Sequence, residues 1–345
     1  MKQKSQIDEY RKKIHKTITF CRAYAVFCIT DRHLPVSTFM KLKRLKTMYG
    51  FGYYPAMNLN LLEKPVNYYN MTEYIDRSLR LSSKSVRELF NDKTVLFKRC
   101  PEFLGRDILI LEEAEKEDII AFMQKNPRFV GKLNHGNFGE KFSVYDVDPE
   151  KYEETIPLFA KNKQELLEGY IYQHEELAKI YPGSVNTLRI HTVNNGNEIR
   201  SYLLPKLRIG CDGSTLDANG DASYRAIVNY DGTLQMPVYI NKNNKVLKAE
   251  RHHNTGVIFS EIRIPFVKEA VELAKTAASY FPEAKFTGWD IAITEKGPVI
   301  VEGNGISGCF ATYQTINYIY NGQGLGKEID EMFSFAEGKT KSCIK

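Results

Sequence analysis

Apolar residues in the first part of the chain recur at the spacing of an α-helix. In residues 7–28 they fall at steps of three or four, which places them on one face of a long amphipathic helix. A stretch rich in glycine and aromatic residues then interrupts the period, and residues 71–90 resume it. We therefore expect a mainly helical N-terminal region over residues 1–90, with a domain boundary near Asn91 and Asp92.

From residue 94 onward the pattern changes to helices that alternate with strands. Helical periodicity is found in residues 112–126, 151–167, 265–280 and 326–335. Short segments rich in β-branched and aromatic residues predict strands at residues 128–133, 169–172, 187–193, 198–209, 225–230 and 234–240. The chain after residue 94 is thus expected to form sheets covered by helices.

Residues 288–304 have the pattern of a β-hairpin, in which two strands of alternating polarity flank a three-residue turn that ends in glycine. If Thr294 pairs with Pro298 across this turn, Asp290 lies directly opposite Glu302. Side chains alternate between the two faces of a strand with period two. The hairpin then has a polar face with Asp290, Glu302 and Asn304, and a core face with Ile291, Ile293, Val299 and Val301.

The polar face of this hairpin predicts a cation site. Two facing carboxylates repel each other, and a hard divalent cation such as Mg²⁺ offsets that repulsion. Carboxylate and amide oxygens are the ligands that Mg²⁺ prefers, and Mg²⁺ usually keeps coordination positions for phosphates and water. A solvated polar face, in which one carboxylate pairs with a lysine, explains the hairpin equally well, so other features must decide.

Basic residues elsewhere in the chain favour a phosphate ligand. Lys132 ends a predicted strand and is followed by a glycine-containing loop, so a cation and backbone N–H groups can approach the same phosphate. Arg189 and Arg208 lie in strand-like segments, with Lys206 beside the latter. Each of these charges could also be an ordinary surface residue, but an arginine within an apolar strand favours an anionic partner. Residues 303–308 match G-x-G-x-x-G, yet too little chain follows for a dinucleotide-binding fold, and we expect the glycines to let the chain pass close to a ligand.

Composition excludes several classes of protein. The 345 residues are 43% hydrophobic and carry a formal net charge of +6, which is mild for a nucleic-acid-binding protein, and we expect no nucleic-acid partner. The 6 cysteines are scattered without a C-x-x-C pair, which argues against a disulfide scaffold or a zinc ribbon. The longest apolar run is far shorter than the ~20 residues that span a bilayer, so we expect a soluble cytoplasmic protein. The basic face of the helix expected over residues 7–28 could bind anionic lipid weakly. A run of basic residues on a helix is, however, more commonly a solvated face.

The order of these features resembles the ATP-grasp superfamily, and more closely its sugar-transfer-associated branch. The resemblance is contained in residues 184–189, 206–210, 288–294 and 297–304, and it extends over about residues 91–335. It implies an α+β ATP-grasp fold, in which an N-terminal lobe at 91–172 and a C-terminal lobe at 173–340 hold the nucleotide between them. The helical residues 1–90 would precede these lobes.

The resemblance also implies roles for individual residues. Lys93 and Lys132 match the lysines that hold the ATP phosphates, with Lys98 as an alternative to Lys93. Gly136 and Gly139 match the flexible loop that closes over the phosphates. The hinge that contacts adenine is matched by Glu168, Tyr170 and Ile171. Glu175 matches the acid that binds ribose. Asp290, Glu302 and Asn304 match the ligands of two Mg²⁺ ions, and Arg189 and Arg208 match residues that face phosphates or an acyl phosphate.

The reaction implied by the resemblance is an ATP-dependent ligation of a carboxylate to an amine through an acyl phosphate. The implied partners are ATP, a carboxylate and an amine, such as an amino acid and a sugar or nucleotide-sugar in the synthesis of a capsular or other surface polysaccharide. Two alternatives remain open at the level of sequence. One is a kinase that phosphorylates a hydroxyl, and the other is a protein that binds a nucleotide or a glycan without catalysis.

Overall fold

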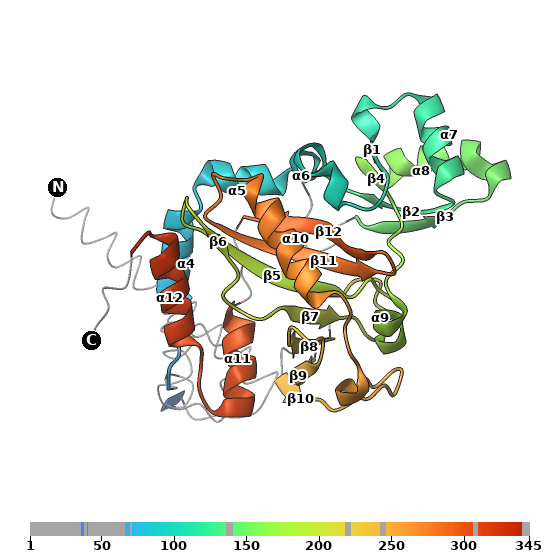
Figure 1. Cartoon of the computed structure of the whole chain (residues 1–345). Coiled ribbons are helices and arrows are strands. Elements are labelled where there is room, and N and C mark those ends of the chain that lie inside the picture. The colour runs from blue at the N-terminus through green and yellow to red at the C-terminus, as the bar shows by residue number, and fades with distance from the viewer. Residues whose placement is uncertain are drawn as a thin grey trace.

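Two sheets built from antiparallel strand pairs form the framework of the protein in a computed structural model (Figure 1). The smaller sheet has four strands in the order β1-β4-β2-β3. The larger sheet has eight, in the order β10-β9-β8-β7-β5-β11-β12 with β6 paired to β5. The structure describes residues 36–37, 40, 66–69, 71–135, 141–217, 222–241, 246–305 and 310–339.

The smaller sheet and two helices form one lobe of the molecule, held together by aromatic rings. The Phe129 ring stacks on Tyr145 with 5.2 Å between centroids, and Phe159 meets both rings edge-on. This core fixes the strand that ends at Lys132. The elements of this lobe are β1 (Ile108–Ile110), α7 (Lys116–Lys125), β2 (Arg128–Lys132), β3 (Ser143–Asp146), α8 (Tyr152–Lys161) and β4 (Leu166–Gly169).

The helix expected over residues 151–167 ends earlier than predicted. Helix α8 stops at Lys161, and residues 166–169 instead form β4, which lies between β1 and β2. Leu166 and Leu167 are completely buried there. A short apolar run is compatible with a helix or a buried strand, so pairing with both neighbours decided the outcome.

Strand β11 lies next to the edge of the larger sheet, between β5 and the edge strand β12. Every residue of β11 except Thr294 is buried, as its nearly continuous apolar sequence requires. The strand expected over residues 198–209 divides into two shorter ones. The strands are β5 (Thr187–Asn194), β6 (Ile199–Arg200), β7 (Lys206–Ile209), β8 (Ser223–Val228), β9 (Leu234–Ile240), β10 (Val246–Lys248), β11 (Phe286–Thr294) and β12 (Gly297–Asn304).

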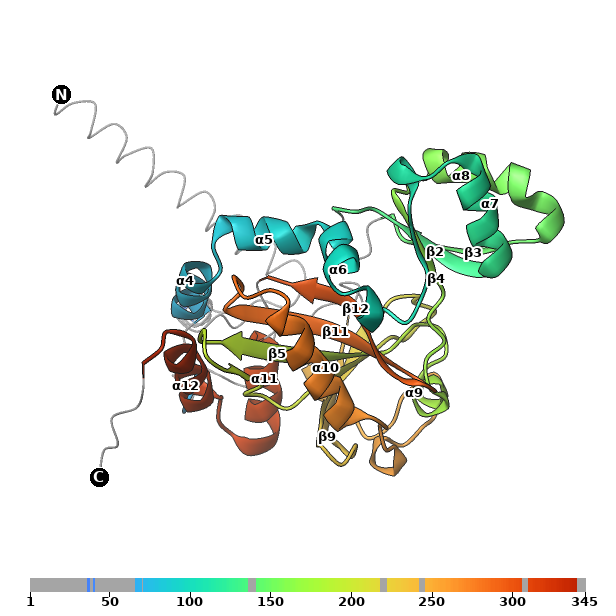
Figure 2. The ribbon, with the colours of Figure 1, turned by 45° about the horizontal axis from the view of Figure 1, so that its top comes forward.

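Helices cover the larger sheet and one of its edges. Helix α10 crosses one face over β5, β11 and β12, while α5 and α6 contact β12 (Figure 2). The helices around this sheet are α4 (Met71–Leu81), α5 (Lys84–Asn91), α6 (Lys93–Arg99), α9 (Glu175–Ile180), α10 (Val267–Ser279), α11 (Phe310–Asn321) and α12 (Gly326–Ala336). The predictions over residues 265–280 and 326–335 correspond to α10 and α12.

The helical pattern over residues 71–90 forms two helices, α4 and α5. Ser83 separates them, because its hydroxyl accepts a hydrogen bond from the Val86 N–H at 3.3 Å and caps α5. Helix α4 then packs against α12 at the far end of the chain. Arg77 binds Asp330 at 2.6 Å and Glu337 at 2.9 Å.

The amphipathic helix expected over residues 7–28 lies outside the described residues, so its basic face stays a prediction. Among the residues that the structure does describe, no helix combines the length and the apolar character needed to cross a bilayer.

Candidate active site

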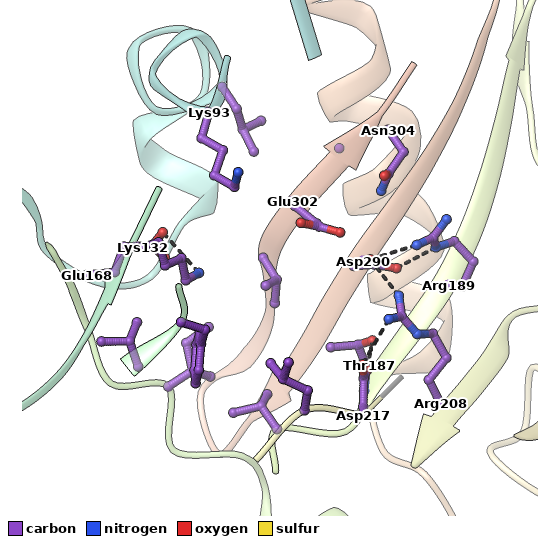
Figure 3. A pocket seen from close by; sticks show the side chains of 18 of the residues that line it. Lys93, Lys132, Glu168, Thr187, Arg189, Arg208, Asp217, Asp290, Glu302 and Asn304 are labelled. Carbon is purple, nitrogen blue, oxygen red and sulfur yellow. Dashed lines mark hydrogen bonds and ion pairs between the residues drawn. The ribbon is translucent and has the colours of Figure 1, made fainter. Parts of the chain in front are cut away.

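A cavity of about 790 Å³ opens between the two sheets (Figure 3). One wall comes from β2, β3 and β4, the other from β5, β7, β8 and β12, and α5 and α6 add residues at one end. Among the predicted site residues, those that line it are Lys93, Lys132, Glu168, Tyr170, Ile171, Arg189, Arg208, Asp290, Glu302 and Asn304. The fold therefore brings together most of the residues chosen from sequence, although they are far apart along the chain.

The predicted hairpin exists, but its register differs from the expected one. Thr294 pairs with Gly297 and not with Pro298, because the turn is one residue shorter than predicted. A β-bulge next to Asp290 then gives β12 one extra residue. The two differences cancel, and Asp290 faces Glu302 as predicted.

The bulge changes which residues of β12 reach the core. Ile300 is completely buried together with Ile291 and Ile293. Val299 and Val301 are only partly buried, and Val301 lines the cavity. The prediction that these two valines lie on the core face is therefore wrong, because one extra residue shifts the alternation along the strand.

Asp290 is a buried carboxylate that binds two arginines. The Arg189 guanidinium contacts both carboxylate oxygens, with 2.8 Å from Nη2 to Oδ2, and Arg208 Nη1 lies 2.7 Å from Oδ2. Burial alone would raise the pKa of Asp290, but the two guanidinium groups outweigh it and hold this pKa well below its usual range. Asp290 is thus ionised, and the alternative in which Arg189 and Arg208 are surface charges is wrong.

Asp217 supports Arg208 from its other side, with 2.9 Å between Arg208 Nη2 and Asp217 Oδ1. The other oxygen of Asp217 accepts hydrogen bonds from the backbone N–H and the hydroxyl of Thr187. Asp217 has no periodic signal in the sequence, because it lies in an irregular segment after β7. Its contacts orient the Arg208 guanidinium toward Asp290 (Figure 3).

The pKa of Glu302 is shifted in the opposite direction from that of Asp290. Burial, followed by the charge of Asp290, raises the pKa of Glu302 to about 7, and the nearby arginines offset this only in part. An added cation would favour the ionised form of such a carboxylate. Asn304 donates its amide N–H to the Gly288 carbonyl at 3.4 Å, which leaves its side-chain oxygen as an acceptor. This oxygen donor set fits Mg²⁺, and Asp290 keeps acceptor capacity because each carboxylate oxygen has two lone pairs.

Glu168 joins two cations on the opposite wall. Lys132 Nζ lies 3.0 Å from Glu168 Oε1, and Arg106 Nη2 lies 2.6 Å from Oε2. Arg106 also donates to the Ile300 carbonyl at 2.8 Å, which ties the smaller lobe to the hairpin. Burial would raise the pKa of Glu168, but Arg106 and Lys132 outweigh it and lower this pKa to about 2. Arg106 was missed because it lies in a turn without a periodic pattern.

Lys93, and not the alternative Lys98, lines the cavity. It donates a hydrogen bond from Nζ to the Asn134 carbonyl at 2.8 Å, and burial lowers its pKa. Lys98 lies on the exposed side of the same helix and pairs with Glu113 at 2.7 Å. Helical geometry explains the difference, because residues five positions apart on a helix of 3.6 residues per turn point in different directions.

Lys206 is a cavity residue for which the sequence left a surface role open. Its side chain is 1% exposed, and its ammonium group lies 4.4 Å from the centre of the Tyr313 ring. Such a contact between a cation and an aromatic face is favourable. Lys206, Arg189 and Arg208 make the wall formed by β5 and β7 rich in basic side chains, although both arginines are paired with Asp290.

The segment after β4 connects the lobes and lines the cavity with Tyr170 and Ile171. The Arg128 guanidinium lies 4.5 Å from the centre of the Tyr170 ring. Glu175, predicted to bind ribose, is exposed, lies 3.8 Å from Lys179 and is not among the residues that line the cavity. The structure thus groups the hinge residues with the cavity but leaves Glu175 outside it.

The glycines of the predicted loops have different outcomes. Gly136 and Gly139 lie outside the described residues, so their proposed role at the phosphates stays a prediction. Gly303 and Gly305 line the cavity, but a side chain at either position would meet α5 first. A Cβ on Gly303 would lie 2.9 Å from the Phe90 ring. These glycines therefore permit close packing of α5 on the hairpin, in addition to passing a ligand site.

The two antiparallel sheets with a cavity between them, lined by lysines, arginines and carboxylates, define an ATP-grasp protein. The chain belongs to the sugar-transfer associated ATP-grasp family, whose model matches residues 82–332. The resemblance seen in the sequence motifs is thereby confirmed. Membership in this family supports ATP binding and a ligase type of activity.

Solved structures with similar folds include one synthase and two synthetases. The carboxyaminoimidazole ribonucleotide synthase of Aspergillus clavatus, complexed with ATP, shows 12% identity and a TM-score of 0.40, covering 63% of this chain and 45% of that one. D-alanyl-alanine synthetase A from Vibrio cholerae shows 11% identity and a TM-score of 0.41, and the match covers 74% of this chain and 66% of that one. D-cycloserine synthetase DcsG shows 12% identity and a TM-score of 0.42, and the match covers 76% of this chain and 78% of that one. The chain spans less than two thirds of the first two, and no curated protein matches it in sequence.

Proposed function

We propose that this chain is an ATP- and Mg²⁺-dependent ligase that joins a carboxylate to an amine through an acyl phosphate. The observation that supports this most is the pair Asp290 and Glu302, which face each other across the hairpin and share one cavity with Lys93 and Lys132. The two lysines together with a facing pair of carboxylates suit a polyphosphate held through divalent metal. We further propose that two Mg²⁺ ions bind the oxygens of Asp290, Glu302 and Asn304.

The proposed roles in ATP binding follow the two walls of the cavity. Lys93 and Lys132 would hold the phosphates, and the backbone of Tyr170 and Ile171 would contact adenine. Bound Mg²⁺ would neutralise charge on the transferred phosphoryl group. Glu168 acts indirectly, since its ion pair with Lys132 at 3.0 Å sets the position of that ammonium group.

The proposed reaction has two steps. The carboxylate of one substrate attacks the γ-phosphorus of ATP, ADP leaves, and an acyl phosphate forms. The amine of the second substrate then attacks the acyl carbon, inorganic phosphate leaves, and the nitrogen loses a proton to give the amide. Arg189 and Arg208 lie on the wall beside Asp290 and would stabilise the negative charge of the acyl phosphate. Positioning and charge stabilisation account for catalysis of this type.

The proposed substrates are an amino acid or small amine and a sugar carboxylate, or an amino acid and an amino sugar, in the synthesis of a capsular or other surface polysaccharide. The description of the family as sugar-transfer associated supports the sugar. The basic side chains of Lys206, Arg189 and Arg208 support an anionic substrate such as a uronic acid or a nucleotide-sugar.

The proposal is tested by incubating the protein with ATP, Mg²⁺ and paired panels of amino acids and uronic or amino sugars. The expected result is release of ADP and inorganic phosphate together with a product whose mass equals both substrates minus water. A phosphorylated product without free phosphate would instead identify a kinase. Failure to bind ATP at millimolar concentration would overturn the proposal altogether.

Matched variants locate the activity in the cavity. Glu302→Gln is expected to lower kcat by at least ~10²-fold, because it removes a charged metal ligand at the reacting phosphates. Glu295→Gln is the matched control, because Glu295 lies in the turn of the same hairpin and is exposed. This variant should leave turnover within about twofold of wild type, as expected for surface changes. Lys93→Met should weaken ATP binding at least ~10-fold, and Lys98→Met is its control on the same helix.

A further inference from the structure

A thiol, a carboxylate and an imidazole lie close together outside the nucleotide cavity, where the chain leaves β7. Cys211 and Asp212 follow this strand, and His253 comes from the segment after β10. One potential ligand atom from each residue lies within 4.8 Å of the others. Within the described part of the chain, this is the one group of its kind built from three histidine, cysteine or acidic residues.

The carboxylate of Asp212 contacts both the thiol and the imidazole. Cys211 Sγ lies 3.7 Å from Asp212 Oδ2, and His253 Nε2 lies 2.5 Å from Asp212 Oδ1. With Zn–S near 2.3 Å and Zn–O near 2.1 Å, sulfur and oxygen ligands are separated by about 3.6 Å. The thiol and Oδ2 therefore already stand at ligand spacing, whereas the imidazole contacts the other oxygen of Asp212 and has to shift for all three residues to hold one ion.

The ring and the carboxylate are held by further contacts of the kind that orient metal ligands. The Tyr224 hydroxyl is hydrogen-bonded to His253 Nδ1 at 2.7 Å and accepts from the His253 backbone N–H at 3.0 Å. This contact leaves Nε2 directed at Asp212. Asn254 donates to Asp212 Oδ1 at 3.3 Å and accepts from the Asp212 backbone N–H at 2.9 Å. Such second contacts fix ligand orientation in protein metal sites.

Burial and ligand chemistry point to the kind of ion. Cys211 is 1% exposed, whereas the side chains of His253 and Asp212 are 39% and 40% exposed. An ion can therefore enter from solvent, and water can occupy a fourth position. Sulfur and imidazole favour Zn²⁺ over Mg²⁺, unlike the oxygen ligands of the cavity. We propose that Cys211, Asp212 and His253 bind a thiophilic divalent cation of the Zn²⁺ class, with water as the fourth ligand.

Binding at this site releases a proton and fixes a loop. The thiol gives up its proton to solvent as the bond to the metal forms, and the neutral imidazole binds through the Nε2 lone pair, with its ring proton on Nδ1 toward the Tyr224 hydroxyl. Residues 211–217 connect the cluster to Asp217, which pairs with Arg208 beside Asp290. The bound ion would therefore hold in place the segment that orients Arg208, without itself taking part in phosphoryl transfer.

The test is a titration of the full-length protein with Co²⁺, a spectroscopic substitute for Zn²⁺, after treatment with a chelator. Wild type should develop a near-ultraviolet charge-transfer band from thiolate to Co²⁺ that saturates at one equivalent, is lost on adding Zn²⁺ and persists in excess Mg²⁺. Cys211→Ser should abolish the band, whereas Cys100→Ser, which removes a buried thiol elsewhere, should retain it. No band in wild type, or an equal band in Cys211→Ser, would overturn the proposal.

Two further variants keep the test decisive if Cys211→Ser fails to fold. His253→Gln replaces a partly exposed ring and should weaken Co²⁺ binding at least ~10-fold. Tyr224→Phe removes only the hydroxyl that holds the ring, and it should weaken binding by roughly 10-fold while the charge-transfer band remains. Unchanged affinity in both variants would show that His253 forms only an ion pair with Asp212.

Discussion

The carboxylates of the site differ in how far neighbouring cations compensate their charges. Asp290 is paired with Arg189 and Arg208. Burial and the charge of Asp290 instead raise the pKa of Glu302 to about 7, which favours its protonated form. On the other wall, Glu168 is over-compensated by Arg106 and Lys132. Of these carboxylates, Glu302 is the one that an added cation would stabilise most.

Acid stability should depend on Glu168. Its pKa is lowered to about 2 in the folded protein, so its stabilising effect is complete above its unfolded value near 4.5 and disappears as pH falls toward 2. The shift corresponds to about 3 kcal/mol. Glu168→Gln should therefore lower the free energy of unfolding at pH 7 and flatten its decrease between pH 5 and 3, measured by urea denaturation. An unchanged slope would contradict the assignment. Glu165→Gln, an exposed neighbour, is the control.

At the scale of elements, the hairpin of β11 and β12 combines three separate requirements. Its short turn and its bulge together place Asp290 opposite Glu302. Ile300 of the same hairpin packs in the hydrophobic core. Its glycines allow α5 to approach, since Phe90 packs against both Phe281 and Trp289 with ring centroids 4.8 and 5.9 Å away. The geometry of the proposed metal ligands thus depends on the packing of a helix.

Gly303→Ala should disturb this packing. The added methyl group would lie 2.9 Å from Phe90 and 3.0 Å from Trp289, both of which are held by other rings. Overpacking of this kind costs roughly 1–3 kcal/mol, which thermal denaturation would detect. In a double-mutant cycle, Phe90→Leu should recover part of that loss because it removes the clashing ring atoms. Strictly additive effects would mean that the methyl group is accommodated elsewhere.

At the scale of the whole molecule, the helices before the matched lobes are joined to the end of the chain. Arg77 on α4 binds Asp330 and Glu337 and lies 4.8 Å from the Phe333 ring centre on α12. Tyr74 packs on Phe310 with ring centroids 5.0 Å apart. The described part of the N-terminal region therefore packs on the larger sheet's helices and contributes α5 residues to the cavity.

Arg77→Met should separate α4 from α12. The Arg77 side chain is 10% exposed, and losing its hydrogen bonds to the partly buried Glu337 and the exposed Asp330 should cost roughly 1.5–3 kcal/mol. Arg80→Met is the control, because its pair with Asp76 is on the surface and should contribute less than ~1 kcal/mol. Chemical denaturation measures both. Limited proteolysis should also cut the Arg77→Met variant faster between α4 and α5, and equal loss of stability in the two variants would refute this arrangement.

The sequence by itself determined the family, the alternation of helices and strands, and the polar pair on the hairpin. Local signals suffice for these, because strand alternation and turn residues act over a few positions. Lys132, Asp290 and Glu302 were found in this way. The choice between Lys93 and Lys98 required the helix to be placed against the sheet, since only then does one side face the cavity.

Only the tertiary structure decided the features that depend on distant partners. Leu166 and Leu167 became a strand because β1 and β2 pair with them on both sides. The bulge in β12, the burial of Lys206, and the supporting roles of Arg106 and Asp217 have no periodic signature, since each depends on contacts with other strands or loops. For the same reason Cys211 and Asp212, which are distant from His253 in the sequence, form no spacing motif with it, and the fold alone brings the three ligand atoms within 4.8 Å.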